Sequence, residues 1–449
     1  MTDTALSPFA EALLDAARAA GADAADALVV DGTSMSIGVL NGALEQAERS
    51  EGIELGLRVL VGQRQACVSA SDTERATIDE MAERAVAMAR LPPEDPNAGL
   101  AEPDQLSDVR DGAALDMNDP GQDPDPAALE RMALEAEAAA MGVAGISQVS
   151  NAGAGFSRRR IHLAATNGFA GGYARSDYGV HCVAITGEGT GMERDYFGDG
   201  RNHLSDLMSP SEIGRIAAER TVARAGAKKP PTGAFPVIYD ERISSTLIGH
   251  LLAATNGTSI ARGSSWARDL LGEAVLPTHL SLIEEPHRPR TSASRPFDAE
   301  GLPTADRAIV RDGVLTGWTL DLSTARQLGL TSTASAARGT GSPPSPSVGN
   351  ARLTAGDLDR DALIAQMGTG LLITSMIGSS INATTGDYSR GASGFWVENG
   401  EIAYPVNECT VAGNLRDMLL SIVPANDARP HLSRVVPSLL VEGMTIAGA

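Results

Sequence analysis

The chain has 449 residues, of which 43% are apolar but only 4% are aromatic, so its cores must be built mainly from Ala, Val, Leu and Ile. This length exceeds the size at which one hydrophobic core stops growing, and we expect two or three domains. The formal net charge is −21, from 57 acidic and 36 basic side chains. So acidic a surface disfavours direct binding to nucleic acid, because such binding depends on Lys and Arg neutralising phosphates.

Disulfide scaffolds, secreted proteins and membrane proteins are disfavoured as well. Cys67, Cys182 and Cys409 lie too far apart in the sequence to form a C-x-x-C metal clip or a disulfide framework. No stretch reaches about 18 unbroken apolar residues, the length that a membrane span needs. The N-terminal residues have neither the basic region nor the long apolar core of a signal peptide. We therefore expect a cytoplasmic protein that has no membrane partner.

The first predicted unit, residues 1–110, is an α+β domain in which helices cover an antiparallel sheet. Apolar residues at helical spacing predict helices over Ser7–Ala20 and Glu74–Leu91. Asn41-Gly42 is a hairpin signal between short runs that are typical of strands. These strands are expected at Asp26–Asp31, Ser34–Leu40, Leu55–Leu60 and Ala66–Ala70.

A second unit, residues 118–228, is expected to pack against the first. The segment from Pro92 to Pro126 is rich in Pro, Asp and Gly, which predicts a linker or a long surface excursion. Helices are predicted over Ala127–Met141 and Pro210–Ala225, the second of them capped by Ser209. Strand-like runs lie between these helices, at residues 145–152, 155–159, 161–167 and 171–187.

The third unit, residues 229–449, is predicted to be a larger β-rich domain. It begins with a strand over Phe235–Tyr239 and a helix over Ile243–Ala254, and Asn399-Gly400 predicts a hairpin near its end. The segment Thr331–Asn350 is so rich in Ser, Gly, Thr and Pro that we expect a mobile loop. The whole chain is thus predicted to be α+β, with an N-terminal α+β part followed by this β-rich domain.

Six stretches resemble, in this order and spacing, the TldD/PmbA (TldE) family. No single stretch indicates a particular chemistry, but together the six stretches are spread over nearly the whole chain. The resemblance implies the fold of a cytoplasmic peptidase that is built from two related subunits and acts on unfolded peptides. The stretches are GTSMSIGVLNGALEQAERSEGIELGLRVLVG at 32–62, ENGEIAYPVNECTVAGNLRDML at 398–419, and residues 83–100, 243–256, 297–334 and 437–448.

One branch of that family carries a zinc motif, H-E-x-x-x-H, on the helix that begins its C-terminal domain, and a Cys near the C-terminus as a further ligand. There two imidazoles and a thiolate hold the zinc, and the Glu takes a proton from the metal-bound water. In the matching window of this chain Ser245 stands for the first His, Thr246 stands for the Glu, and only His250 matches. No Cys lies between Asn426 and Met444. The chain therefore resembles the metal-less PmbA/TldE branch, and we expect zinc only in its partner subunit.

No other residues predict a metal site or a catalytic group in this chain. His279 and His287 flank Glu284-Glu285, but a polar surface hairpin or loop is the favoured interpretation of that segment. His250 lies on the Leu247 side of an apolar helix, which favours a role in a core or an interface over a metal role.

The run Gly370–Ser380 has the composition of a strand that could line a substrate passage. It is apolar and β-prone, and its glycines would let a second backbone approach closely. A peptide can add to an open sheet edge through main-chain hydrogen bonds, which need no particular sequence. A plain buried strand remains the alternative, and Trp318, Phe395 and Trp396 are either interface anchors or core residues. The candidate passage residues are Ile373, Ser375, Gly378, Ser379 and Ser380.

These observations favour a non-catalytic, zinc-less subunit that forms a heterodimer with a zinc-bearing TldD-type homologue and helps it degrade unfolded peptides. When isolated, such a chain could form a homodimer through the surface meant for its partner. Two alternatives remain open. One is an independent metallopeptidase that uses His250 with non-standard ligands, and the other is a non-enzymatic modulator of a peptide maturation system related to DNA gyrase.

Overall fold

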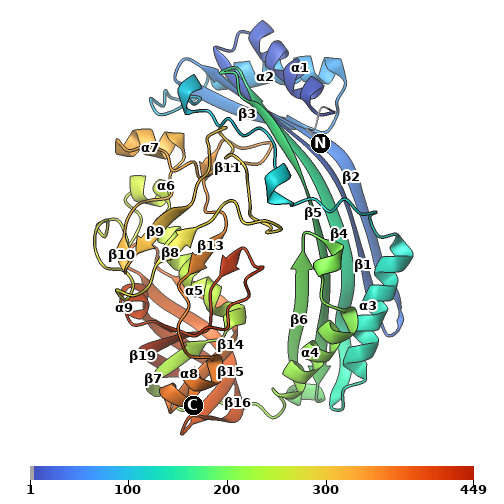
Figure 1. The fold of residues 1–449 in the computed structure, drawn as a ribbon, viewed down its shortest axis with the longest axis vertical. Coiled ribbons are helices and arrows are strands. Elements are labelled where there is room, and N and C mark those ends of the chain that lie inside the picture. The colour runs from blue at the N-terminus through green and yellow to red at the C-terminus, as the bar shows by residue number, and fades with distance from the viewer. Residues whose placement is uncertain (1–4, 449) are drawn as a thin grey trace.

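The computed structural model describes residues 5–448. The first half of this chain forms one long curved sheet, and the second half forms a domain that faces one side of it (Figure 1). The predicted α+β class and the β-rich C-terminal region are both confirmed. Within the described residues no helix is sufficiently long and apolar to cross a bilayer.

All six strands of the N-terminal sheet pair antiparallel, in the order β3-β2-β1-β4-β5-β6. The first and the second predicted units both contribute strands to this one sheet. Its strands are also longer than predicted, because Gly and Ser positions that looked like interruptions lie within continuous strands. The strands are β1 (Ala24–Leu40), β2 (Ala43–Val61), β3 (Arg64–Ala70), β4 (Ile146–Ala165), β5 (Ala170–Thr186) and β6 (Glu193–Arg201).

Four helices cover one face of this sheet. The residues of β1 that are buried beneath them are all odd-numbered, since alternate residues of a strand point to the same face. They are Ala25, Ala27, Val29, Met35, Ile37 and Val39. The predicted Ser209 cap is confirmed, because its hydroxyl accepts a hydrogen bond from the backbone N–H of Glu212 at 3.3 Å. The helices are α1 (Ser7–Ala19), α2 (Arg75–Ala89), α3 (Pro126–Met141) and α4 (Pro210–Val222).

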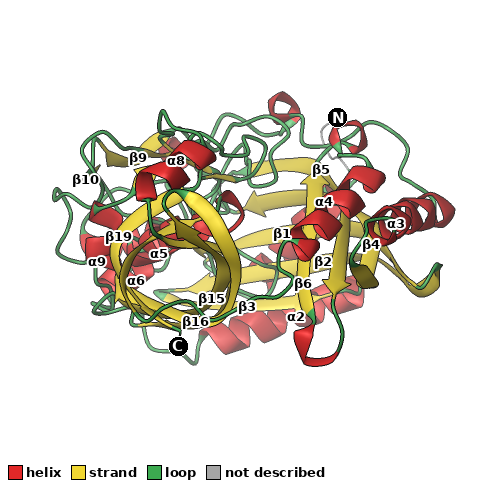
Figure 2. Cartoon of the chain, turned by 90° about the horizontal axis from the view of Figure 1, so that it is seen from below, coloured by secondary structure: helices red, strands yellow, loops and turns green. Residues whose placement is uncertain are grey.

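The C-terminal domain is built on a strand barrel that Figure 2 shows end-on. The strand order is β16-β15-β14-β7-β19-β17, and pairing between β16 and β19 closes the ring. Helix α8 packs on the outside of the barrel against Ile238, Leu372 and Leu440, whereas α5 joins the core on the opposite face of the same strands. These elements are β7 (Gly233–Tyr239), β14 (Gly370–Ile381), β15 (Asp387–Glu398), β16 (Glu401–Asn414), β17 (Val423–Pro424), β19 (Leu439–Ala447), α5 (Glu241–Ala254) and α8 (Arg360–Met367).

A smaller five-stranded sheet and short helices complete the C-terminal domain. The predicted hairpin at Asn399-Gly400 is confirmed, with φ of 54° and 81° at its two residues, as expected for a turn that matches strand twist. The remaining elements are β8 (Leu282–Glu284), β9 (Arg307–Arg311), β10 (Val314–Leu315), β11 (Ala336–Ala337), β12 (Ser345–Pro346), β13 (Ala351–Leu353), β18 (Arg434–Val435), α6 (Gly257–Ala261), α7 (Leu322–Leu328) and α9 (Leu415–Leu420).

The segment Thr331–Asn350 is not the mobile loop that its composition predicts. Its Arg338 side chain is fully buried and forms an ion pair with Asp26 of β1. A Cβ atom placed on Gly56 would lie 2.5 Å from the carbonyl oxygen of Thr340, so the segment touches the sheet where only glycine fits. The segment therefore straps the C-terminal domain to the N-terminal sheet, and tertiary packing orders a stretch with little structural preference of its own.

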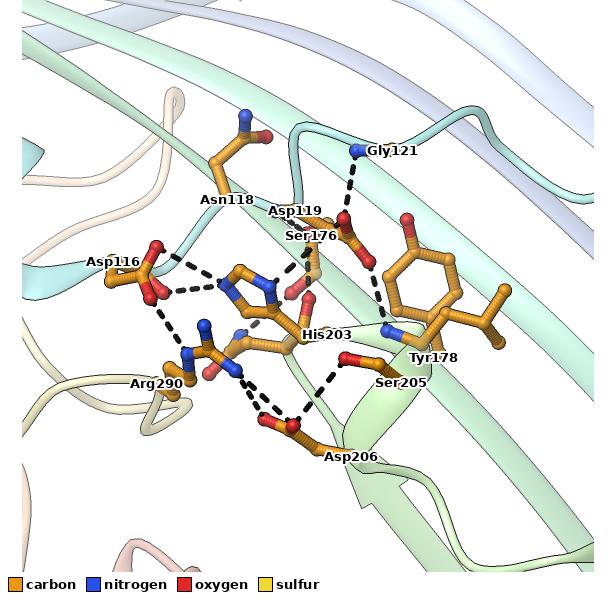
Figure 3. A network of polar contacts seen from close by, with 12 residues as sticks. Asp116, Asn118, Asp119, Gly121, Ser176, Tyr178, His203, Ser205, Asp206 and Arg290 are labelled. Carbon is orange, nitrogen blue, oxygen red and sulfur yellow. Dashed lines mark hydrogen bonds and ion pairs between the residues drawn. The ribbon is translucent and has the colours of Figure 1, made fainter.

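A polar network fixes the long segment that connects the first two units (Figure 3). Nε2 of His203 lies 2.9 Å from the carbonyl oxygen of Asp116, and the Asp119 carboxylate accepts a hydrogen bond from the backbone N–H of Leu204 at 2.9 Å. Arg290 of the C-terminal domain pairs with Asp116 at 2.6 Å and with Asp206 at 3.0 Å. Of the two predicted forms of the 92–126 segment, the structure has the long surface excursion, and ion pairs join it to the C-terminal domain.

Candidate functional site

Helix α5 carries the residues that the zinc motif would require. It begins after Asp240, whose side chain caps it, and its Leu247 and Leu251 are buried in the largest core. Thr246 is exposed, and its hydroxyl donates a hydrogen bond to the carbonyl oxygen of Ile243 at 2.6 Å, within the same helix. Position 246 therefore has a hydroxyl that is hydrogen-bonded to the backbone, and it has no carboxylate.

His250 is half-buried and turned toward the barrel. Its ring packs edge-on against the ring of Tyr388, with 5.8 Å between the centroids, and its buried Nε2 has no hydrogen-bond partner in the described residues. Burial, together with the nearby charge of Arg390, lowers the pKa of His250. The imidazole is thus neutral at neutral pH. A neutral imidazole can ligate a metal, but within the described residues this one belongs to no group of three potential ligands.

Strand β14 has one open edge beside α5. Its first residues, Leu371–Ile373, lie between β7 and β15, with β7 parallel and β15 antiparallel. The residues that follow, Ser375–Ile381, pair with β15 only, and within the described chain no strand pairs with their other edge. Helix α5 contacts this strand, and Figure 1 shows both elements on the side of the C-terminal domain that is turned toward the sheet.

The five predicted passage residues fall into two groups, one in the half of β14 that is paired on both sides and one in the half with an open edge. Ile373 is fully buried and paired on both sides, so its side chain is a core residue that a peptide cannot reach. Ser375 is half-buried, whereas Gly378, Ser379 and Ser380 are exposed. Gly378 has a φ of 66° and lies in a bulge, where its carbonyl oxygen accepts a hydrogen bond from Arg390 at 2.8 Å. The open half of the strand is therefore shaped by a bulge that turns it away from regular pairing.

The face of the N-terminal sheet opposite its four helices carries many small residues over part of its length. Near the α1 end, Leu28 on this face packs against Phe297 of the C-terminal domain. Toward the other end the apolar side chains give way to Gly and Ser, and an open hollow of about 920 Å³ remains. Such residues leave the strand backbone accessible to a second chain. The hollow is lined by the small residues Ser34, Ser36, Gly155, Ser157, Gly179, Gly198 and Gly200, together with His181 and the acidic Glu48 and Asp177.

Buried ion pairs hold α5 against the last strand of the sheet. Arg242, near the start of α5, pairs with Asp195 of β6 at 3.1 Å, and both side chains are less than a tenth exposed. Arg224, which follows α4, donates a hydrogen bond to the hydroxyl of Ser393 on β15 at 2.9 Å. These contacts join the sheet, which carries the hollow, to the domain that carries the open edge of β14.

Comparisons with known proteins agree with this architecture. Models of the PmbA/TldA metallopeptidase family match residues 25–89 as domain 1, 119–225 as the central domain and 232–448 as the C-terminal domain. A metalloprotease PmbA of Escherichia coli O157:H7 is 35% identical over 95% of this chain and 92% of its own. A metalloprotease PmbA homolog of Haemophilus influenzae is 36% identical over 97% of this chain and 94% of its own. This chain belongs to the PmbA/TldD family.

Solved structures support the same assignment at the level of fold. A protein of Bacteroides thetaiotaomicron that is called a modulator of DNA gyrase superposes with a TM-score of 0.91 at 27% identity, over 99% of both chains. TldE from Thermococcus kodakarensis superposes with a TM-score of 0.86 over 98% of this chain and all of its own, and at 19% identity it shows a shared fold.

The zinc that the name of the PmbA/TldD metallopeptidase family implies does not fit the residues of this chain. Among residues 5–448, no three His, Cys, Asp or Glu side chains are grouped so that they could hold a metal ion. Cys409 is buried and its thiol donates a hydrogen bond to the carbonyl oxygen of Ala392, and burial raises its pKa to about 11. A thiol with so high a pKa is a poor source of the thiolate that zinc requires.

The remaining sequence candidates are structural or exposed. Trp318 and Trp396 are at most 5% exposed and belong to the barrel core, so core packing is confirmed for both. His287 hydrogen-bonds the hydroxyl of Thr304, and His279 is exposed. Sequence reasoning missed the hollow on the sheet face. The available signal was the small residues at every second position of β4, such as Gly153, Gly155 and Ser157, but the predicted strands stop on either side of Gly153.

Proposed function

We propose that this chain is the metal-free partner of a zinc-bearing TldD-type homologue, in a heterodimeric peptidase that degrades or processes unfolded peptides. The observation that carries the proposal is the surface of α5. Ser245 and Thr246 stand where hydrolysis needs an imidazole and a carboxylate, and within the described residues His250 belongs to no group of three side chains that could hold a metal ion. Catalytic zinc needs three protein ligands and one open position.

The role proposed for this subunit is to hold extended peptide beside the partner's metal. Two features support it: the open edge of β14 at Ser375–Ile381 and the small-residue hollow on the sheet. The open edge of β14 offers unpaired main-chain groups, so a peptide would be held there by backbone hydrogen bonds whatever its sequence, and the glycines of the hollow would let its backbone lie close to the sheet. That mode suits a peptidase that acts on unfolded chains.

Co-expression with a TldD-type homologue tests the assembly. Size-exclusion chromatography with light scattering is expected to give a 1:1 complex, and metal analysis is expected to find zinc in the complex but not in this chain alone. Peptidase activity on an unstructured peptide should likewise require both chains. Two separate elution peaks, or zinc and activity in this chain alone that are lost on His250→Ala, would overturn the proposal in favour of an independent metallopeptidase.

The open edge of β14 is tested by a pair of matched substitutions. Ile377 on this edge is 75% exposed, and Ile402 on β16 is 49% exposed. Because both side chains are exposed, replacing either by Asp should change stability by less than about 0.5 kcal/mol. Ile377→Asp in the complex is expected to raise the KM for peptides, whereas Ile402→Asp should leave it unchanged. Equal effects of the two substitutions would contradict a substrate role for this edge.

The name of the Bacteroides thetaiotaomicron neighbour suggests a second function, modulation of DNA gyrase without proteolysis. With a net charge of −21, such an effect would act through protein or peptide and not through DNA. Affinity purification of the tagged chain separates the two functions, since recovery of gyrase without a peptidase partner would favour modulation.

A further inference from the structure

A polar cavity lies where the N-terminal sheet, the connecting segment and the C-terminal domain meet. Its volume is about 230 Å³, which is below the roughly 300 to 1,000 Å³ of pockets that take drug-sized ligands. None of its lining residues belongs to α5 or to β14, and it has no part in the function proposed above. Its lining residues include Arg58 and Gln65 of the sheet, Gly99 of the connecting segment, and Arg262, Glu300 and Asp321 of the C-terminal domain.

The charged groups of this cavity do not neutralise one another. Glu300 is only 9% exposed, and its carboxylate accepts one hydrogen bond, from the backbone N–H of Leu322 at 2.8 Å. No cationic side chain lies within 4 Å of this carboxylate in the part of the chain that the structure describes. Arg58 lines the same cavity, but its guanidinium is already paired with Asp26 at 2.5 Å. A buried carboxyl without a counter-ion is costly unless it stays protonated or acquires a cation.

Burial raises the pKa of Glu300 to about 8, and the neighbouring Asp298 and Asp321 add to the shift, while Arg58 opposes it. One carboxylate oxygen of Asp321 is taken up by the backbone N–H and the hydroxyl of Thr324. In the empty cavity Glu300 therefore keeps its proton at neutral pH. An ammonium group bound beside it would replace that proton.

The complementary charge stands at the mouth of the cavity. Arg262 is exposed, and its guanidinium forms no ion pair or side-chain hydrogen bond with any described residue. An Arg guanidinium matches a carboxylate by two parallel hydrogen bonds. The cavity thus contains a buried carboxyl group, Glu300, without a paired cation, and an exposed guanidinium group, Arg262, without a paired anion.

We propose that this cavity binds a free α-amino acid, with the ligand's ammonium group on Glu300 and its carboxylate on Arg262. A zwitterion of this size supplies both missing charges and brings no net charge into the cavity. Free amino acids are also the end products of peptide hydrolysis. Because the walls come from both halves of the chain, a bound amino acid would tie the sheet to the C-terminal domain.

Isothermal titration of the full-length chain with glycine, L-alanine and L-leucine tests the proposal. At least one of them is expected to bind with a Kd in the millimolar range or below. Its N-acetyl derivative lacks the ammonium group and its amide lacks the carboxylate, so each should bind at least about tenfold more weakly. Absence of heat up to about 20 mM ligand, or equal binding of the blocked derivatives, would overturn it.

Substitutions at Arg262 and Glu300 test the two proposed contacts with the bound amino acid. Arg262→Met is expected to raise the Kd at least about tenfold, whereas Arg268→Met, which alters another exposed Arg of the same loop outside the cavity, should not change it. Glu300→Gln should weaken binding likewise. If Glu300→Gln does not fold, the comparison of Arg262→Met with Arg268→Met still tests the proposal. An unchanged Kd for Arg262→Met refutes the assignment of the ligand's carboxylate to Arg262.

Discussion

Replacing Asp26 by Asn should destabilise the N-terminal sheet strongly. Asp26 is 4% exposed and pairs with Arg58, which is equally buried, and with the fully buried Arg338 of the strap segment. An Asn at this position leaves two buried guanidinium groups without their counter-ion. Breaking a buried ion pair by removal of one partner costs about 3 to 5 kcal/mol. The matched control is Asp15→Asn, whose ion pair with Arg18 is more than half exposed and should contribute less than about 1 kcal/mol.

Urea unfolding followed by two probes measures this effect. The three tryptophans, Trp266, Trp318 and Trp396, all lie in the C-terminal domain, so their fluorescence reports that domain, while circular dichroism reports both halves. With an m value of about 3 kcal/mol/M, a loss of 3 to 5 kcal/mol lowers the midpoint by roughly 1 to 1.7 M. The circular dichroism transition should move by this amount ahead of the fluorescence transition, because the sheet is affected first.

The effect of Asp26→Asn should also depend on pH. Burial acts to raise the pKa of Asp26, but the charges of Arg58 and Arg338 outweigh burial and hold the pKa below its usual 3.8. The unfolded chain therefore binds the proton at higher pH than the folded chain does, and the stabilisation is present above pH 3.8 and is lost as the pH falls through the folded-state value. A variant within 0.5 kcal/mol of the wild type at pH 7, measured by circular dichroism, would refute this reasoning.

Three further predictions concern packing, metal and pH. Gly214→Ala should cost about 1 to 3 kcal/mol in urea unfolding, because its Cβ would lie 2.0 Å from a carbonyl oxygen of α3, whereas Gly249→Ala on α5 meets no atom within 4 Å and should stabilise by up to about 1 kcal/mol. Ser245→His combined with Thr246→Glu should still bind no stoichiometric zinc by metal analysis, since a third ligand is missing; one zinc per chain would contradict this. Glu300→Gln should match the wild type near pH 4.5 and exceed it by roughly 2 to 4 kcal/mol above pH 8, because a folded-state pKa of about 8 makes the wild type lose stability as pH rises between these values; a pH-independent difference would exclude it.

Local sequence signals predicted the five longest helices, α1 to α5, well, whereas the short helices α6 to α9 were not predicted. Helix α3 runs from Pro126 to Met141 with Asp125 as its side-chain cap, within one residue of the predicted range, and α5 is two residues longer at its start. These signals succeed because capping and helical periodicity act between residues three or four positions apart. The decisive feature of the candidate site, Ser245 and Thr246 in place of a His and a Glu, also needed no structure.

Strand extents were predicted less well. Two short runs proposed within residues 24–40 are one strand, and three within 146–165 are another. Ser and Gly in these strands lower the local β preference, but pairing on both sides stabilises the backbone there. Strand preference depends on what covers each face, and this information is not local.

The sequence by itself determined the family, the fold class, the positions of the five longest helices and the lack of a zinc motif, because each depends on which residues stand at which positions along the chain. Only the tertiary structure decided that β16 pairs with β19 to close the barrel, that Arg338 reaches Asp26 across 312 positions, and that Glu300 and Arg262 share a cavity. Contacts between residues so far apart form when many marginal interactions are satisfied together by one packed arrangement, and no short window of sequence specifies that arrangement.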